Sequence, residues 1–358
     1  MTFVLGREAG VDAGPVGRLG AYRALDGSDG APLYLDVDGP HAALVVGKRG
    51  YGKSYTLGVV AEFLARTPGV APVIVDPMGV FAPMADAEDT DGPVPATVVA
   101  EPSVAPTALD PRSWCALLGL DPESGAGSLV WRAAQTGDRL PAMRQSIDDA
   151  DAPTRDRRAA INHLSLAESW GVFDDEGLSA QDLAGHALTV VDVSGLDPAP
   201  MNAVVRGIGD VLYRMRVDET VERLPWLLVD EAHAFFDGVA RAALERILTR
   251  GRAPGVSLVV ATQRPSAIPP VAVSQSDILV AHRLTAQTDL DALARARPTY
   301  LTTALENQLP SVPGEVVVVD DATETVHTAQ VRERQTPHGG DNPRVSDRSW
   351  ADTLGAGR

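Results

Sequence analysis

The feature that most constrains this chain is a glycine-rich loop set between an apolar run and a helix-favouring run. Its residues are Gly47, Lys48, Arg49, Gly50, Tyr51, Gly52, Lys53 and Ser54, and Tyr55 follows. They match the Walker A pattern, in which glycines turn the backbone so that its N–H groups surround a phosphate at a helix N-terminus. We expect all nine residues to contact ATP, with Lys53 at the β- and γ-phosphates and Ser54 on Mg²⁺.

Lysine occurs only in this loop. The chain has 358 residues, 31 of them basic and 48 acidic, a formal net charge of −17, and Lys48 and Lys53 as its two lysines. Lysine is thus retained where a compact ammonium reaches a phosphate, because a planar guanidinium does not substitute for it there. The acidic, lysine-poor composition suggests adaptation to high internal salt, as in halophilic archaea. An ordinary acidic protein from a GC-rich genome is the alternative.

Cysteine usage and hydropathy predict a cytoplasmic protein. Cys115 is the only cysteine, so no internal disulfide can form. No apolar run reaches the roughly 18 residues of a membrane span, and residues 1–20 lack a signal-peptide pattern. We therefore expect a cytoplasmic chain without membrane contact.

Short apolar segments alternate with helical patterns from residue 41 onward, as in a wound α/β core with a mainly parallel sheet flanked by helices. Expected strands cover 42–46, 73–76, 188–193, 226–229, 256–261, 277–281 and 316–319, and expected helices cover 53–65, 198–217, 238–250 and 287–296. We assign 1–40 to a short N-terminal β extension, 41–331 to the core with a helical insert at about 105–185, and 332–358 to a disordered tail. Residues 82–103, rich in Pro, Ala and Asp, are expected to form a surface loop.

Paired carboxylates follow a second apolar strand. Asp230 and Glu231 come directly after the run 224–229. We expect Asp230 to hold Mg²⁺ through water, and Glu231 to orient and deprotonate the attacking water of a hydrolysis reaction. The alternative is a strand that ends in an acidic turn. Asp76 and Asp192, also at strand ends, either lie near the metal or cap the next helix.

A third group of polar residues surrounds the strand expected at 256–261. Gln263 follows this strand, where its amide can sense the γ-phosphate. Arg250 and Arg252 precede the strand and could reach the nucleotide of a neighbouring subunit as arginine fingers. The alternative is that both arginines are cations at a helix C-terminus.

In chain order, these motifs resemble the HerA branch of the HerA/FtsK ATPases. The resemblance covers about residues 16–330 and rests on segments 47–54, 76–81, 191–196, 230–233, 250–252, 263–265, 282–284 and 314–315. It implies a RecA-like P-loop core and a hexameric ring with nucleotide sites at subunit interfaces. It also implies ATP-driven translocation on double-stranded DNA, commonly beside a NurA-type nuclease. By position, it makes Arg250 or Arg252 the finger that acts in trans, and Arg283 a further phosphate-side or interface arginine.

Two departures from the family pattern affect what can be carried over. The family usually has a small β-barrel before the P-loop that helps dock the nuclease, whereas 46 residues precede Gly47 here. The family's second core strand usually ends in a Gly-Glu-aromatic turn, where this chain has Gly79, Val80 and Phe81. The resemblance therefore transfers no carboxylate to that turn, and it leaves the nuclease partner open.

The leading functional hypothesis is a ring motor that couples ATP hydrolysis to movement along duplex DNA. The chain has no basic run, so the expected DNA contacts are Arg264, after Gln263, and Arg155, Arg157 and Arg158 of the insert. An alternative is an assembly or scaffold ATPase of a defence or secretion system that does not translocate on DNA. A metabolite kinase is disfavoured, because Glu231 and Gln263 suit water activation.

Overall fold

In the computed structural model, one continuous sheet carries the core. The structure describes residues 3–7, 13–23, 28–86, 94–295 and 308–339, so residue 296 of the last expected helix lies outside it. Within these ranges the strand order is β1-β3-β2-β12-β11-β10-β4-β9-β8-β5-β7-β6. The strands are β1 (Phe3–Leu5), β2 (Val16–Arg23), β3 (Asp29–Asp36), β4 (Ala42–Val46), β5 (Val70–Asp76), β6 (Ala96–Val99), β7 (Leu188–Asp192), β8 (Leu224–Val229), β9 (Ser257–Thr262), β10 (Ile278–Ala281), β11 (Glu315–Asp320) and β12 (Thr325–Val331).

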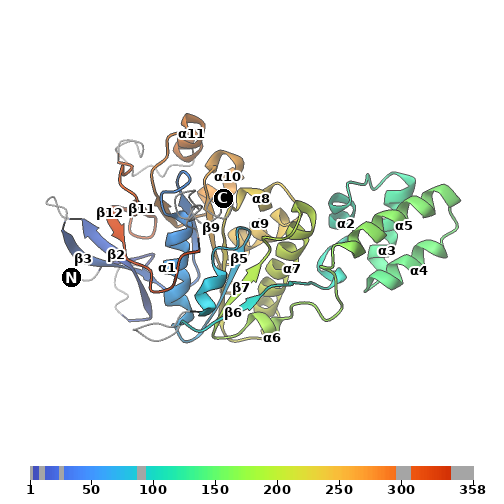
Figure 1. Cartoon of the computed structure of the whole chain (residues 1–358), viewed down its shortest axis with the longest axis horizontal. Coiled ribbons are helices and arrows are strands. Elements are labelled where there is room, and N and C mark those ends of the chain that lie inside the picture. The colour runs from blue at the N-terminus through green and yellow to red at the C-terminus, as the bar shows by residue number, and fades with distance from the viewer. Residues whose placement is uncertain (1–2, 8–12, 24–27, 87–93, 296–307, 340–358) are drawn as a thin grey trace, which may run out of the picture.

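The half of the sheet from β10 to β6 is parallel throughout. Strands β5 and β9 are buried along their whole length, as strands covered on both faces must be. Helix α1 (Lys53–Ala65) covers one face, and α7 (Pro198–Val217) and α9 (Arg241–Arg250) cover the other (Figure 1). Successive residues of a strand belong to different hydrophobic clusters. Leu228 packs in the cluster on the α1 side of the sheet, and Leu227 packs in the cluster on the α7 side. The expected α/β class is therefore confirmed.

The other half of the sheet is mainly antiparallel and joins the two ends of the described chain. Strand β11 pairs with β10, β12 with β11, β2 with β12 and β3 with β2, all antiparallel. Tyr22 lies opposite Ala329, and Gly20 lies opposite Val331. A Cβ atom on Gly20 would lie 2.0 Å from the Gln330 carbonyl oxygen, so the close approach of β2 to β12 requires a glycine there. The N-terminal strands thus extend the core sheet.

The sequence patterns do not predict strands β6 and β12. Strand β6 lies within the expected surface loop 82–103 and pairs with β7 at the sheet edge, where its four residues are mostly half-buried. Strand β12 mixes polar and apolar residues, and only Ala329 and Val331 of its seven residues are buried. Neither strand has the continuous apolar run that identifies the buried parallel strands.

The helical insert has its own hydrophobic core. It comprises α2 (Pro111–Leu117), α3 (Gly125–Thr136), α4 (Leu140–Asp148) and α5 (Thr154–Ser169), which Figure 1 shows grouped beyond α7 at one end of the molecule. Buried residues of all four helices, Trp114 and Met143 among them, form one cluster. At its base, Asp110 accepts hydrogen bonds from Ser113 at the start of α2 and from buried Arg206 of α7, at 2.9 and 3.1 Å. The bond from Arg206 joins the insert to the core.

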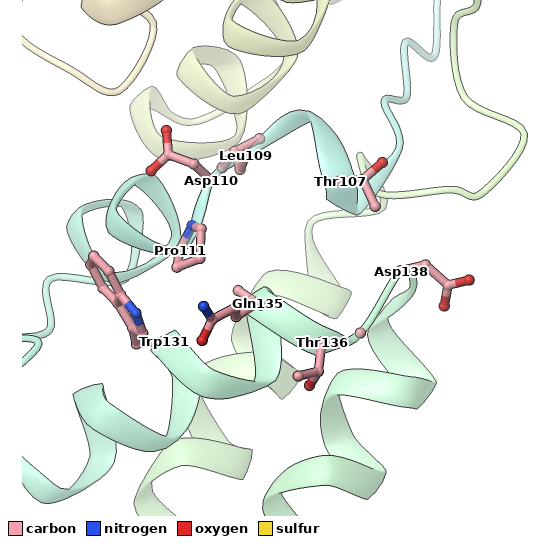
Figure 2. A pocket seen from close by; sticks show the side chains of 10 residues that line it. Thr107, Leu109, Asp110, Pro111, Trp131, Gln135, Thr136 and Asp138 are labelled. Atoms are coloured by element: carbon pink, nitrogen blue, oxygen red, sulfur yellow. The ribbon is translucent and has the colours of Figure 1, made fainter.

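An open pocket of about 540 Å³ lies within the insert. Figure 2 shows Asp110 and Pro111 at the start of α2 on one side, and Gln135 and Thr136 of α3 on the other. The pocket contains none of the residues expected to bind nucleotide.

The segment after β12 runs across α1. Buried Glu62 of α1 accepts hydrogen bonds from Arg332 Nη1 at 2.7 Å, from the backbone N–H groups of Gln335 and Thr336, each at 2.9 Å, and from Thr336 Oγ1 at 2.7 Å. The expected tail from residue 332 therefore begins with a segment held against the P-loop helix. Residues 340–358 lie outside the described ranges.

The remaining helices are short. They are α6 (Ala180–Leu183), α8 (His233–Phe236), α10 (Pro270–Ser274), α11 (Gln287–Arg295) and the 3-10 turns Ala82–Asp86, Pro106–Ala108 and Pro265–Ala267. Among the described residues, none of the helices combines the length and the apolar character needed to cross a membrane.

Candidate active site

The Walker A loop lies at the carboxyl edge of the parallel strands, between β4 and α1. Gly50 and Gly52 have φ angles of 81° and 106°. Such positive φ angles favour glycine, because a Cβ atom makes this backbone conformation energetically unfavourable. Helix α1 begins directly after Gly52, so the backbone N–H groups of its first turn face the loop. The arrangement is that of an anion-binding helix N-terminus.

Lys53 is buried in the loop and is 5% exposed. Its Nζ donates to the Lys48 carbonyl oxygen over 3.4 Å. Burial lowers the pKa of Lys53, while the nearby charges of Glu231 and Asp230 raise it. An anion such as a phosphate next to this ammonium would relieve the cost of its burial.

The Walker A serine touches the aspartate of the second motif. Ser54 Oγ donates to Asp230 Oδ2 over 2.6 Å, and Asp230 is 1% exposed. These two oxygen atoms fit Mg²⁺, which prefers hard oxygen ligands and takes others from phosphate and water. The described residues contain no cluster of three or more His, Cys, Asp and Glu side chains that could hold a metal by themselves. Ser54 and Asp230 therefore place two oxygen atoms of the kind that Mg²⁺ binds next to each other, close to the Walker A loop.

Glu231 occupies an unusual backbone position directly after β8. Its φ of 45° is rare for a residue other than glycine, and such conformations cost about 1–3 kcal/mol. Burial raises the pKa of its carboxyl group, the neighbouring Asp230 raises it further, and a hydrogen bond from the Gln263 side chain opposes the shift. A carboxylate with a raised pKa is a stronger base, which suits proton removal from water. The hydrogen bond between their side chains places Gln263, which follows β9, next to Glu231.

His233 lies close to the same carboxylate. Its Nδ1 is 3.3 Å from Glu231 Oε2 and 3.3 Å from Thr262 Oγ1. Burial lowers the pKa of His233, and the charges of Arg264 and Lys53 lower it further. The neutral ring therefore contacts Glu231 without forming an ion pair.

Of the three candidate arginines, Arg283 lies beside the loop. Its backbone oxygen accepts a hydrogen bond from Lys48 N over 2.8 Å, and its guanidinium carbon lies 5.8 Å from the Tyr51 ring centre. Lys48 Nζ lies 4.5 Å from the same centre. Tyr51 is thus flanked by two cations at the mouth of the loop.

Arg250 and Arg252 lie at the opposite edge of the sheet. Arg250 ends α9, and Gly251 bonds to Val256 just before β9, whose first residues pair with the amino end of β4. A strand of this length spans roughly 15–20 Å, and the chain's own P-loop follows the other end of β4. Both arginines are exposed. The structure does not bring them to the chain's own site.

The strand-end aspartates close their own turns. Asp76 accepts hydrogen bonds from the backbone N–H groups of Met78, Val80 and Phe81 at 3.2, 3.1 and 2.7 Å. Asp192 accepts one from Ser194 N at 2.9 Å. These bonds lie in the turns that follow β5 and β7, so neither carboxylate caps the next helix, and α7 has Asp197 at its N-cap.

Two residues near the loop have contacts that the sequence patterns do not indicate. Tyr55, in the first turn of α1, accepts a hydrogen bond at its hydroxyl from Arg334 N over 2.6 Å. His282, the residue after β10, lies under the loop and is 1% exposed. In the sequence, His282 directly follows a short apolar strand and opens segment 282–284 of the family resemblance, and neither signal indicates its contact with the loop.

Comparison with known proteins agrees with this geometry. The family described as "Helicase HerA, central domain" matches residues 16–208, while none of the curated protein sequences compared matches the chain. VirB4 of Thermoanaerobacter pseudethanolicus shares the fold with a TM-score of 0.67 at 17% identity, over 91% of this chain and 98% of that one. The bacterial plasmid coupling protein TrwB, in a complex with ADP and Mg²⁺, matches with a TM-score of 0.59 at 16% identity, over 93% and 98% of the two chains. With more than half of its length matched by the family and a RecA-like P-loop ATPase fold, the chain belongs to the HerA family of the HerA/FtsK ATPases.

Proposed function

We propose that this protein hydrolyses ATP as one subunit of a ring and uses the energy to move along double-stranded DNA. The observation that carries the proposal is the convergence of Lys53, Ser54, Asp230, Glu231 and Gln263 at one edge of the sheet. Membership of the HerA family supports it.

The chemical step follows from the roles of these side chains. Lys53 and the N–H groups of the loop hold the phosphates, and Gln263 and Glu231 orient a water molecule against the γ-phosphorus. The water oxygen attacks, one of its protons passes to the Glu231 carboxylate, and the bond to the β,γ-bridging oxygen breaks to give ADP and phosphate. Mg²⁺, held by Ser54 and Asp230, would supply charge neutralisation.

Substitutions at the loop and at the base test hydrolysis directly. We expect Lys53→Ala to abolish nucleotide binding, because it removes the only cation buried at the phosphate site among the described residues. We expect Glu231→Gln to bind ATP but to hydrolyse it about 10²–10⁴ times more slowly, as loss of a general base does. Normal turnover by Glu231→Gln would mean that another group activates the water.

The positions of Arg250 and Arg252 support action between subunits. Because they lie at the edge opposite the chain's own P-loop, they can serve a nucleotide only in a neighbouring copy. Mixing Arg250→Ala subunits with Glu231→Gln subunits tests this. Partial recovery of ATPase activity is expected if one subunit supplies the arginine and the other the base, and an unchanged background rate contradicts shared sites.

Contact with DNA is proposed for exposed arginines at two places, Arg264 after β9 and Arg155 and Arg158 on α5. Arg157 is less available, since its Nη1 donates to the Asp148 carbonyl oxygen over 2.9 Å. Stimulation of the ATPase by duplex DNA should be lost in the Arg155→Ala, Arg158→Ala double variant and should weaken with added salt. A NurA-type nuclease remains a proposed partner.

The strongly acidic composition favours a second candidate, an assembly ATPase that does not move on DNA. A net charge of −17 without a basic run opposes binding to a polyanion. Native mass measurement with ATP, with and without duplex DNA, distinguishes the two. ATP-dependent assembly with no response of turnover to DNA supports the second candidate, and a DNA-bound hexamer with faster turnover supports the motor.

A further inference from the structure

The residue after β10 continues the sheet into the phosphate loop. Strand β10 pairs in parallel with β4, and Ala281 lies opposite Val46. Beyond the strand ends, His282 N donates to the Val46 carbonyl oxygen and Lys48 N donates to the Arg283 carbonyl oxygen, each over 2.8 Å. The first residues of the loop are therefore held by the backbone of 282–283.

The side chain of His282 packs against two glycines of the same loop. A Cβ atom on Gly47 would lie 2.5 Å from His282 Cβ, and one on Gly52 would lie 3.2 Å from His282 Cε1. Its Nε2 is 3.0 Å from Thr56 Oγ1 in the first turn of α1. The imidazole thus touches both ends of the loop and the helix that follows.

The other ring nitrogen of His282, Nδ1, is also buried, and no hydrogen bond of good geometry reaches it. Burial and the charge of Lys53 together lower the pKa of the ring to about 3, although a hydrogen bond with the Tyr51 backbone opposes this shift. The ring is therefore neutral at physiological pH. A charged ring here would repel Lys53, so the neutral form is the one compatible with a lysine directed at phosphate.

We propose that His282 is a positioning residue for the nucleotide, which holds the Walker A loop in its phosphate-binding shape through Thr56, Gly47 and Gly52. This inference rests on the proposed ATPase function. Since the loop contacts the phosphates before and during hydrolysis, His282 contributes to ground-state and transition-state binding alike. Its removal should therefore raise the KM for ATP and the Kd for ADP and leave kcat close to that of the wild type.

Three variants separate the parts of this contact. His282→Leu removes both ring nitrogens at similar volume, Thr56→Val removes the hydroxyl, and His282→Gln keeps a polar atom near the position of Nε2. His186→Gln is the matched control, because His186 is an exposed histidine between α6 and β7. We would measure the Kd of the full chain for ADP with Mg²⁺ by calorimetry, together with KM, kcat and the melting temperature.

The expected result is a roughly five- to tenfold rise in Kd for His282→Leu and for Thr56→Val, the size of one lost hydrogen bond. The double variant should be no worse than either single one, because both remove the same contact. His282→Gln should recover part of the affinity, and His186→Gln should match the wild type.

Wild-type Kd in a folded Thr56→Val protein, or a fall in kcat at unchanged KM in His282→Gln, would overturn the proposal. If His282→Leu does not fold, Thr56→Val and His282→Gln still decide the question. A wild-type chain that binds no nucleotide would instead overturn the proposed function, so the two failures can be told apart.

Discussion

Replacing Glu62 by alanine should destabilise the protein far more than replacing a typical glutamate. Glu62 is fully buried on α1, and its two oxygens accept hydrogen bonds from Arg332, Gln335 and Thr336. Arg334, which is 2% exposed at its side chain, lies 3.7 Å from the same carboxylate. Removing the carboxylate therefore leaves buried cations without a counter-charge.

The size of the effect follows from that burial. Breaking a buried ion pair by removing one partner costs about 3–5 kcal/mol, because the remaining charge stays desolvated. We therefore expect Glu62→Ala to lower the free energy of unfolding by about 4 kcal/mol. Glu62→Gln keeps one carbonyl acceptor and the side-chain volume, so it should lose roughly half as much.

Urea unfolding of the full chain measures the change, with Glu168→Ala as the matched control. Glu168 also pairs with an arginine, Arg144, at 2.8 Å, but its side chain is 58% exposed. An exposed pair contributes at most about 1 kcal/mol. Equal losses in Glu62→Ala and Glu168→Ala would refute the reasoning, since burial would then make no difference.

Three further predictions concern the stability of the sheet and of the helical insert. Burial lowers the pKa of His41, but hydrogen bonds to Asp277 and Asp36 raise it to about 9, above the ordinary 6.5. The raised pKa adds about 3 kcal/mol of stability that is present below pH 6.5 and lost as the pH rises through 9, so His41→Gln should flatten the fall in melting temperature between pH 6.5 and 9.5. Gly20→Ala should lower the melting temperature by breaking the β2–β12 approach, whereas Gly39→Ala, with nothing within 4 Å of its added Cβ, should not. Asp110→Ala removes both the cap of α2 and a partner of Arg206, so it should cost about 1–2 kcal/mol and speed limited proteolysis of the insert.

The elements that sequence patterns predict best are those whose signal is local. Strand β4, helix α1 and helix α7 begin and end where the apolar runs, glycines and prolines indicate. The Walker A loop and the Asp230–Glu231 pair are likewise continuous in the chain, so their place at one sheet edge follows from parallel topology.

What could not be predicted depends on contacts between distant segments. His282 lies more than 200 positions from Thr56, and Glu62 receives its hydrogen bonds from residues about 270 positions later. The left-handed backbone conformation of Glu231 could not be predicted either, because glutamate rarely adopts a positive φ angle.

The pairing of β2 with β12 has a consequence for how the protein is made. Gly20 pairs with Val331, so the first described hairpin must wait for the last strand, 311 positions later, before the sheet is complete. At about 5–20 residues per second, a ribosome takes roughly 15–60 s to synthesise the intervening chain. During that interval β2 has an open edge able to pair with other chains. The open edge of β2 therefore persists until β12 has been synthesised.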